Sequence, residues 1–187
     1  MTRLQIIRKA DLTEISWKNG GGITRNIATH GDERGMLWRL SMADVTQDGP
    51  FSAFDGLTRI LTVIEGDGLV LHGPDRDWHA GFAQPVTFDG GTPIMAELTQ
   101  GPLTDFNLMF DTVRCTSTAQ VLSGPATQTI GAEGQTLVVH VITGAADLDR
   151  GDTILGVADT AISKNAPHRL TLATGDIALI IGLRPDS

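Results

Sequence analysis

Apolar residues along this chain come in short runs or alternate with polar ones, and helical periodicity is nearly absent. Gly, Pro, Asp and Asn bound most of these runs, as is typical of strands joined by turns. In "MLWRLSMADV", for example, large apolar side chains occupy every second position. The expected strands cover residues 36–45, 57–66, 105–113, 136–144, 152–157 and 176–183. The pattern predicts an all-β chain with very little helix.

One strand pattern occurs twice. "RILTVIEG" at 59–66 resembles "LVVHVITG" at 137–144, with Arg59 aligned on Leu137 and Gly66 aligned on Gly144. Two copies of one β unit would fit the chain length, and the Ser/Thr/Gly/Pro-rich segment 115–125 would divide them. We therefore expect two similar halves, residues 1–117 and 118–187.

Charge and composition exclude several classes of partner. The 187 residues carry a formal net charge of −8 and no basic run, so we expect no nucleic-acid partner. No apolar stretch reaches the roughly 18–20 residues of a membrane span, and "MTRLQIIRKADL" lacks the apolar core of a signal peptide. Cys115 is the single cysteine, which rules out an internal disulfide. These features predict a cytoplasmic protein that does not contact a membrane.

The residue patterns of metal sites and of common catalytic sites are missing. The five histidines stand singly, with no H-x-H, H-E-x-x-H or C-x-x-C motif. The chain has no G-x-S-x-G motif and no tyrosine. We expect no metal, no cofactor and no catalytic residue.

The stretch "WKNGGGITRN" (17–26) admits three interpretations. A phosphate-binding loop is disfavoured, because the lysine precedes the glycines and the pattern that follows alternates like a strand. A glycine turn leading into a strand is one alternative. The other is the rim of a binding site, since glycines let the backbone approach a ligand closely and a cation beside an amide suits a carboxylate. The residues that would contribute are Trp17, Lys18, Asn19 and Arg25.

Two arginines within strand patterns support an anion site. Arg39 lies among alternating apolar residues, and Arg59 begins the apolar run "ILTVI". An arginine on the inner face of a β-barrel needs an anionic partner, either a ligand or an internal carboxylate. The candidate internal carboxylates are Asp44, Asp48 and Asp55. Asn107, in "DFNLM", suits either a ligand or a backbone contact.

Several motifs together resemble the HutD/Ves family of bacterial proteins: "WKNGGGITR", "WRLSMADV", "GPFSAFDGLTRILTVIEG" and "DFNLM". The resemblance is strong from the start of the chain to the end of "DFNLM", and it is weaker beyond that motif. It implies a cupin-type double β-barrel, that is, a bicupin with two RmlC-like jelly-roll halves. It also implies a setting in histidine utilisation, and a regulatory or ligand-binding role with formylglutamate among the proposed ligands.

The sequence departs from the related patterns at informative positions. Asn26 stands where the family usually has glutamate. When the metal-binding motif of cupins is aligned on Gly66, the two histidines become Ser52 and Phe54, and the glutamate becomes Arg59. Such a pocket would repel a metal cation and attract an anion. Arg59 aligns with Leu137 in the second half, so the pocket is expected in the first half.

We therefore expect a regulatory protein that binds a small anionic metabolite, and we favour a non-enzymatic role. One alternative is a metal-independent isomerase or lyase in which Lys18 acts as base and Arg59 stabilises an enolate. Another is an interaction module, and a homodimer through a strand edge or a sheet face is expected on any of these hypotheses. The predicted ligand-binding residues are Trp17, Lys18, Asn19, Arg25, Arg39, Ser52, Phe54, Arg59 and Asn107.

Overall fold

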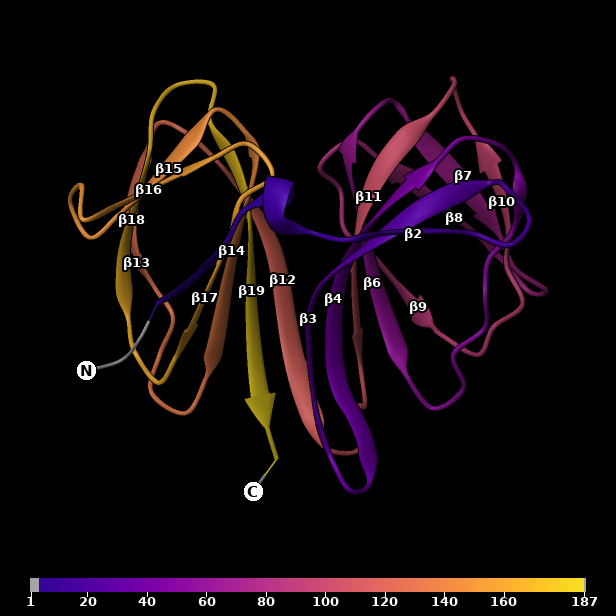
Figure 1. Cartoon of the computed structure of the whole chain (residues 1–187), viewed down its shortest axis with the longest axis horizontal. Helices are drawn as coiled ribbons and strands as arrows, with labels where there is room; N and C mark the ends of the chain where they lie inside the picture. The colour runs from indigo at the N-terminus through magenta and orange to yellow at the C-terminus, as the bar shows by residue number, and fades with distance from the viewer. Residues whose placement is uncertain (1–3, 187) are drawn as a thin grey trace. The chain divides into compact units, whose positions relative to one another are not determined.

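The computed structural model describes residues 4–186, which form strands β1–β19 and a single short 3₁₀ helix, η1 (Lys9–Asp11) (Figure 1). The prediction of an all-β chain with very little helix is confirmed. In the described part of the chain, no helix is long and apolar enough to cross a membrane.

The chain divides into two compact units. The first unit is Thr13–Arg114, and the second comprises the described residues 4–12 and 115–186. This division differs at two points from the sequence-based halves 1–117 and 118–187. The second unit begins at Cys115, with β12 (Cys115–Ser123), and it also contains β1 (Gln5–Ile7), because β1 pairs with β17 (Thr160–Lys164).

The first unit consists of two antiparallel sheets. The six-stranded sheet has the order β2 (Glu14–Ser16), β3 (Gly22–Asp32), β4 (Gly35–Val45), β11 (Leu103–Phe110), β6 (Thr58–Glu65), β9 (Val86–Asp89). The four-stranded sheet has the order β5 (Gly49–Pro50), β10 (Met95–Leu98), β7 (Gly68–His72), β8 (Asp77–Gly81). Side chains from both sheets form one buried cluster: Val45, Leu61, Val63, Leu69, Leu71, Ala80, Phe88, Ile94, Ala96 and Leu103.

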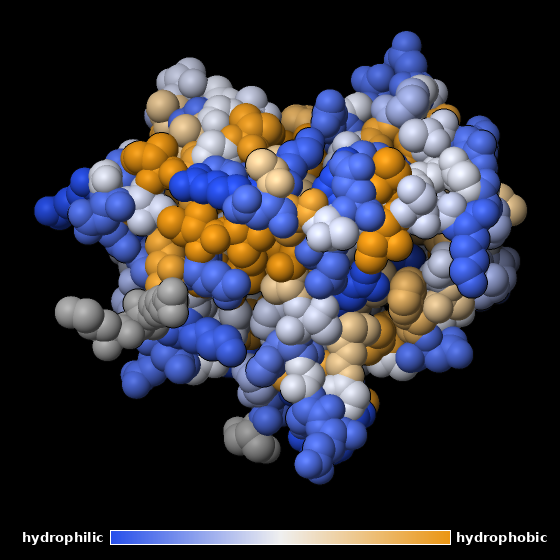
Figure 2. All heavy atoms as spheres, in the orientation of Figure 1, coloured by the Kyte–Doolittle hydropathy of each residue, from blue (hydrophilic) through white to orange (hydrophobic). Residues whose placement is uncertain are grey.

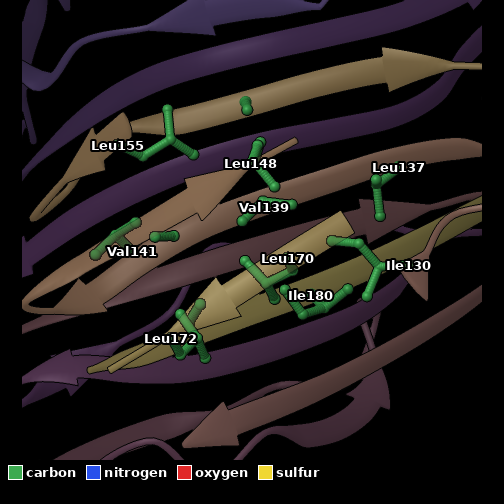
Figure 3. Close-up of a cluster of buried hydrophobic side chains, with 12 residues drawn as sticks. Ile130, Leu137, Val139, Val141, Leu148, Leu155, Leu170, Leu172 and Ile180 are labelled. Atoms are coloured by element: carbon green, nitrogen blue, oxygen red, sulfur yellow. The ribbon is translucent and has the colours of Figure 1, made fainter. Parts of the chain in front are cut away.

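The second unit repeats this arrangement. One sheet has the order β1, β17, β14 (Thr136–Thr143), β19 (Ile177–Pro185), β12, and the other has the order β13 (Ala126–Ile130), β18 (His168–Leu172), β15 (Ala145–Leu148), β16 (Thr153–Gly156). Figure 3 shows the aliphatic side chains that pack between its strands, among them Leu137, Val139 and Val141 of β14. In the alignment of the two repeated segments, these three fall on Arg59, Leu61 and Val63 of β6. The internal repeat seen in the sequence therefore corresponds to equivalent inward-facing positions.

The alternation in β4 and β11 has an unexpected consequence for burial. All of β11 is buried. In β4, Trp38, Leu40 and Met42 are buried, and so are Ser41 and Ala43 on the opposite face. The face with Trp38, Leu40 and Met42 is buried, and the more polar face with Arg39 and Ser41 points into the first unit. Polar residues on an amphipathic strand usually face water. Here they line an internal cavity.

Exposed apolar side chains of the second unit include Ile6, Ile154 and Val157. In the view of Figure 2, apolar atoms gather over β14 and β15. The expected homodimer and the expected cytoplasmic location both stay predictions.

Candidate ligand-binding cavity

A cavity of about 720 Å³ lies entirely within the first unit. Its volume falls in the usual range of small-molecule sites. It brings together eight of the nine residues that the sequence predicted as ligand-binding: Trp17, Lys18, Asn19, Arg39, Ser52, Phe54, Arg59 and Asn107. Trp17 and Asn107, which lie far apart in the chain, therefore line the same cavity.

The register of β4, β11 and β6 places the polar side chains in rows across the cavity wall. Residues that are directly paired on adjacent strands point to the same face of a sheet. The rows are Arg39–Met109–Arg59, then Ser41–Asn107–Leu61, then Ala43–Asp105–Val63. Leu61 and Val63 also belong to the buried apolar cluster, so the polar wall continues directly into the core.

Arg59 is the central cation of the cavity and is only 5% exposed. Its guanidinium carbon lies 5.2, 5.8 and 5.1 Å from the ring centroids of Phe51, Phe54 and Phe88. Nη2 donates a hydrogen bond to Asn107 Oδ1 at 2.8 Å. Burial lowers the pKa of Arg59, the charge of Asp105 raises it, and Arg39 lowers it further. Arginine nevertheless stays protonated in proteins, so the cavity contains a buried positive charge.

Asp105 is the carboxylate that acts on Arg59, and it was not among the residues predicted from the sequence. It is 1% exposed, lines the cavity, and accepts a hydrogen bond from Asn107 Nδ2. Asn107 therefore bridges the carboxylate and the guanidinium. Within the described residues, Arg59 forms no ion pair with the three expected partners, Asp44, Asp48 and Asp55. The sequence did contain an indication of Asp105, because alternation along the strand puts its side chain on the same face as Asn107.

Burial raises the pKa of Asp105 to about 7, with Arg59 lowering it and Asp44 raising it. Replacing Asp105 by asparagine should therefore change the pH dependence of stability. The unfolded carboxyl ionises near its ordinary value of 3.8 while the folded one stays neutral, so Asp105 carries no penalty at low pH, and its own contribution to stability falls as the pH rises toward 7. The rise in pKa corresponds to roughly 4 kcal/mol as an upper bound.

In urea titrations at a series of pH values, the Asp105→Asn variant is expected to be the more stable protein above about pH 7. Its advantage should shrink toward about pH 4. A variant that loses stability equally at all pH values would contradict the assignment of a neutral, buried Asp105.

Arg25 was predicted to contact the ligand, but the structure places it outside the cavity lining. Its Nε and Nη2 donate to Glu14 Oε1 at 3.0 and 2.5 Å, and its Nη1 donates to Asp44 Oδ2 at 2.8 Å. Asp44 also accepts from Thr104 Oγ1. Alternation explains the difference, since Arg25 pairs with Met42 of β4, whose side chain belongs to the apolar face rather than the cavity face. Arg25 thus links β2, β3 and β4.

The triple glycine forms a tight turn between β2 and β3, which confirms the turn interpretation. Trp17, Lys18 and Asn19 of the same stretch line the cavity, and their role in binding a ligand stays a prediction. Trp17 N–H donates to the Gly22 carbonyl at 2.9 Å, and Gly20 N–H donates to the Trp17 carbonyl at 3.0 Å. Gly20 has a φ of +73°, which favours glycine. Asn19 Oδ1 accepts from Gly21 N–H at 3.0 Å, so a ligand contact by Asn19 would come from its amide nitrogen.

Trp17 and Arg39 are each held in place at the cavity. Trp17 Nε1 donates to Thr24 Oγ1 at 2.8 Å, and the Trp17 ring meets Phe51 edge to face with centroids 6.3 Å apart. Arg39 Nε donates to Asn26 Oδ1 at 2.9 Å. Asn26, at the position where the family usually has glutamate, therefore orients Arg39 without neutralising its charge.

The side chains at the positions of the cupin metal ligands do not suit a metal ion. These side chains are Ser52, Phe54 and Arg59, and the guanidinium repels a cation. Among the described residues, no group of three or more His, Cys, Asp or Glu side chains is placed to hold a metal ion. The polarity of the cavity suits an anion instead.

A second cavity, of about 360 Å³, occupies the corresponding place in the second unit, and its described lining residues are all uncharged. The equivalent rows are Arg39–Met109–Arg59 in the first unit and Thr118–Gly182–Leu137 in the second. Hydroxyl, amide and aliphatic side chains take the place of the charged groups of the first cavity. The charged cavity is therefore a property of the first unit, as the alignment of Arg59 with Leu137 predicted.

Comparisons with known proteins agree with this description. The HutD family model matches residues 9–180. The chain is 33% identical over 181 residues to Protein Ves of Citrobacter koseri, covering 91% of this chain and 92% of that one. It is 38% identical over 129 residues to an uncharacterized 21.2 kDa protein in the hutC 3′ region of Pseudomonas putida, covering 66% and 67% of the two chains.

Solved structures give the same result. HutD from Pseudomonas fluorescens SBW25 superposes with a TM-score of 0.88 at 29% identity, covering 99% of this chain and 100% of that one. Protein Ylba from E. coli superposes with a TM-score of 0.72 at 10% identity, covering 96% and 90% of the two chains, and shares the cupin-like fold alone. On sequence and on structure, the chain belongs to the HutD family and has a cupin fold.

Proposed function

We propose that the first-unit cavity binds a small carboxylated metabolite and that the protein serves a regulatory, non-catalytic role in histidine utilisation. The observation that carries this proposal is the buried Arg59, which Asp105 reaches only through the Asn107 amide. Arg39 and Lys18 line the same cavity, so its described lining holds three cations and one carboxylate. A buried charge without a direct partner is costly, and a ligand carboxylate would remove that cost.

The metabolic setting is supported by the relatives. One is named HutD, and another is encoded in a hutC 3′ region. Formylglutamate is the first candidate ligand, because its carboxylates match the cations of the cavity. Its formamide group adds a polar acceptor and donor that Asn19 and Asn107 are suited to meet.

The alternative is a metal-independent isomerase or lyase acting on a small acid. Lys18 is exposed at the cavity rim, whereas Asp105 is buried in the cavity wall. Asp105 suits that role better, because a buried carboxyl with a pKa of about 7 is tuned for proton transfer near neutral pH. The enzymatic alternative therefore rests on Asp105, with Arg59 as the group that stabilises an enolate.

The proposal is tested by thermal unfolding of the protein with N-formyl-L-glutamate, urocanate and related acids. A ligand at about 100 times its Kd adds about 2.7 kcal/mol to stability. For a chain of this size that raises the Tm by roughly 5–10 °C. The corresponding amides, which lack the carboxylate, serve as controls and should give no shift. Equal shifts with acids and amides, or none with any acid, would contradict the proposal.

A further inference from the structure

Asp105 carries an atom whose hydrogen bonding is incomplete. Its Oδ2 is buried, belongs to a residue of the cavity lining, and has no hydrogen-bond partner among the described residues. Buried side-chain oxygens are satisfied in the large majority of cases, so such an atom calls for an explanation. Asp105 lines the cavity, so the partner for Oδ2 is sought in a ligand bound there.

The hydrogen bonds around Asn107 decide which oxygen of Asp105 is left open. Arg59 can only donate, so it must meet the carbonyl oxygen of the Asn107 amide. The Asn107 Nδ2 group is then directed at Asp105 Oδ1, which accepts its hydrogen bond. Oδ1 is an acceptor whether the carboxyl is ionised or neutral. A proton on Asp105 is therefore carried by Oδ2.

The state of Oδ2 determines which ligand it can meet. As a carboxylate oxygen it would accept a hydrogen bond from a ligand N–H or ammonium group. As a neutral acid it would donate one to a ligand oxygen. The two states thus favour ligands of opposite chemistry, and they give opposite dependences of affinity on pH.

The charged groups around Asp105 act on it in opposite directions: Arg59 favours the ionised carboxylate, and Asp44 favours the neutral acid. Arg59 on β6 faces it, Arg39 on β4 and Lys18 in the turn line the same cavity, and Asp44 on β4 acts on it from the other face. Asp44 is itself held by Arg25. No histidine is among the cavity-lining residues in the described part of the chain. A ligand carboxylate attracted by the cations adds a negative charge close to Asp105, and this disfavours a second one.

We propose that Asp105 is a ligand-contacting residue that binds as the neutral acid, with Oδ2–H donating to an oxygen of the anionic ligand, so that binding takes up a proton. This inference rests on the proposed function and deepens it. The proton comes from solvent, and no covalent bond of the ligand changes. The consequence for specificity is a preference for acids without an ammonium group, since a neutral Asp105 offers no counter-charge. N-formyl-L-glutamate should bind more tightly than free glutamate.

Isothermal titration calorimetry with N-formyl-L-glutamate tests the proposal. Its carboxyl groups stay ionised across the range from about pH 6 to pH 9, so the ligand itself takes up no proton. Titrations in HEPES and in Tris, which differ in ionisation enthalpy, count the protons exchanged. Wild-type protein is expected to take up close to one proton at about pH 8, and its affinity should fall up to tenfold per pH unit above neutrality.

The Asp105→Asn variant keeps an N–H donor at the position of Oδ2 and has no proton to exchange. It should bind without proton uptake and with an affinity that is flat over the same pH range. The Asp67→Asn variant removes one charge from an exposed turn of the same unit, and it should behave as wild type. Unfolding midpoints of both variants show whether each is folded.

Wild-type affinity that is independent of pH, or that increases with pH, would overturn the role of Asp105 and leave the proposed function standing. A preference for glutamate over its N-formyl derivative would do the same. Absence of binding by any acid across the whole pH range would overturn the proposed function, and this inference with it.

Discussion

The Arg59→Met variant is expected to bind carboxylated ligands roughly 30- to 5,000-fold more weakly than wild type. Truncating one partner of a buried, hydrogen-bonded charge pair costs about 2–5 kcal/mol. Arg59 is the most deeply buried of the three lining cations, and neither of the others can replace it, because Arg39 is held by Asn26 and Lys18 lies at the exposed rim. Calorimetric titration with N-formyl-L-glutamate measures the loss.

The fold of this variant should survive. Methionine is apolar and flexible, and the three phenylalanine rings around the guanidinium can pack against it. Asp105 loses its attraction to Arg59 but can become neutral by binding a proton, so no uncompensated charge remains buried.

The matched control is Arg34→Met. Arg34 pairs with Asp32 on the surface, its side chain is 74% exposed, and it does not line the cavity. This control removes the same charge and should leave binding unchanged. If the Arg59→Met variant is folded and binds as tightly as wild type, Arg59 does not bind the ligand.

The Gly22→Ala variant is expected to lose on the order of 1–3 kcal/mol of stability, or more. An added Cβ would overlap the backbone carbonyl oxygen of Asp44 and would lie 3.1 Å from the Trp17 ring. The carbonyl belongs to the adjacent strand β4 and cannot rotate away, so β3 and β4 must separate locally. Trp17 would be displaced from the cavity rim. Thermal unfolding should show a Tm lower by roughly 3–10 °C.

Gly49→Ala is the control for this substitution. A Cβ at Gly49 meets no heavy atom within 4 Å, and its φ is not positive, so its stability should stay close to wild type. Equal stability of the two variants would show that the turn does not depend on the close approach of Gly22 to Asp44.

Strand existence and strand type were predictable from local pattern. The run "TRILTVIE" is apolar at most positions and bounded by turn residues, and it forms β6 over nearly all of its predicted range. Short strands bounded by glycine and aspartate leave little room for helix, which is why the fold class followed from the sequence. The short strands β1, β2 and β5 carried too few residues for a pattern.

The cavity was also predictable in part from the local pattern of apolar and charged residues. Arg39 and Arg59 interrupt apolar runs, and a charged residue in such a run needs a partner. Arg25 looked similar in sequence, but the register of β3 against β4 turns its side chain toward Glu14 and Asp44. Asp105 lies near the start of its strand, close to a loop, and an aspartate in that position resembles a turn former.

By itself, the sequence determined the all-β class, the repeat of one β unit, the family, and the substitution of a cation for a metal ligand at position 59. Each of these features follows from the local order of residues or from the spacing of motifs. Only the tertiary structure decided that Asp105 rather than Asp44, Asp48 or Asp55 acts on Arg59, and that Asn107 joins them. The reason is physical: which polar groups meet depends on the pairing register of strands distant in the chain, and one residue of register reverses the face.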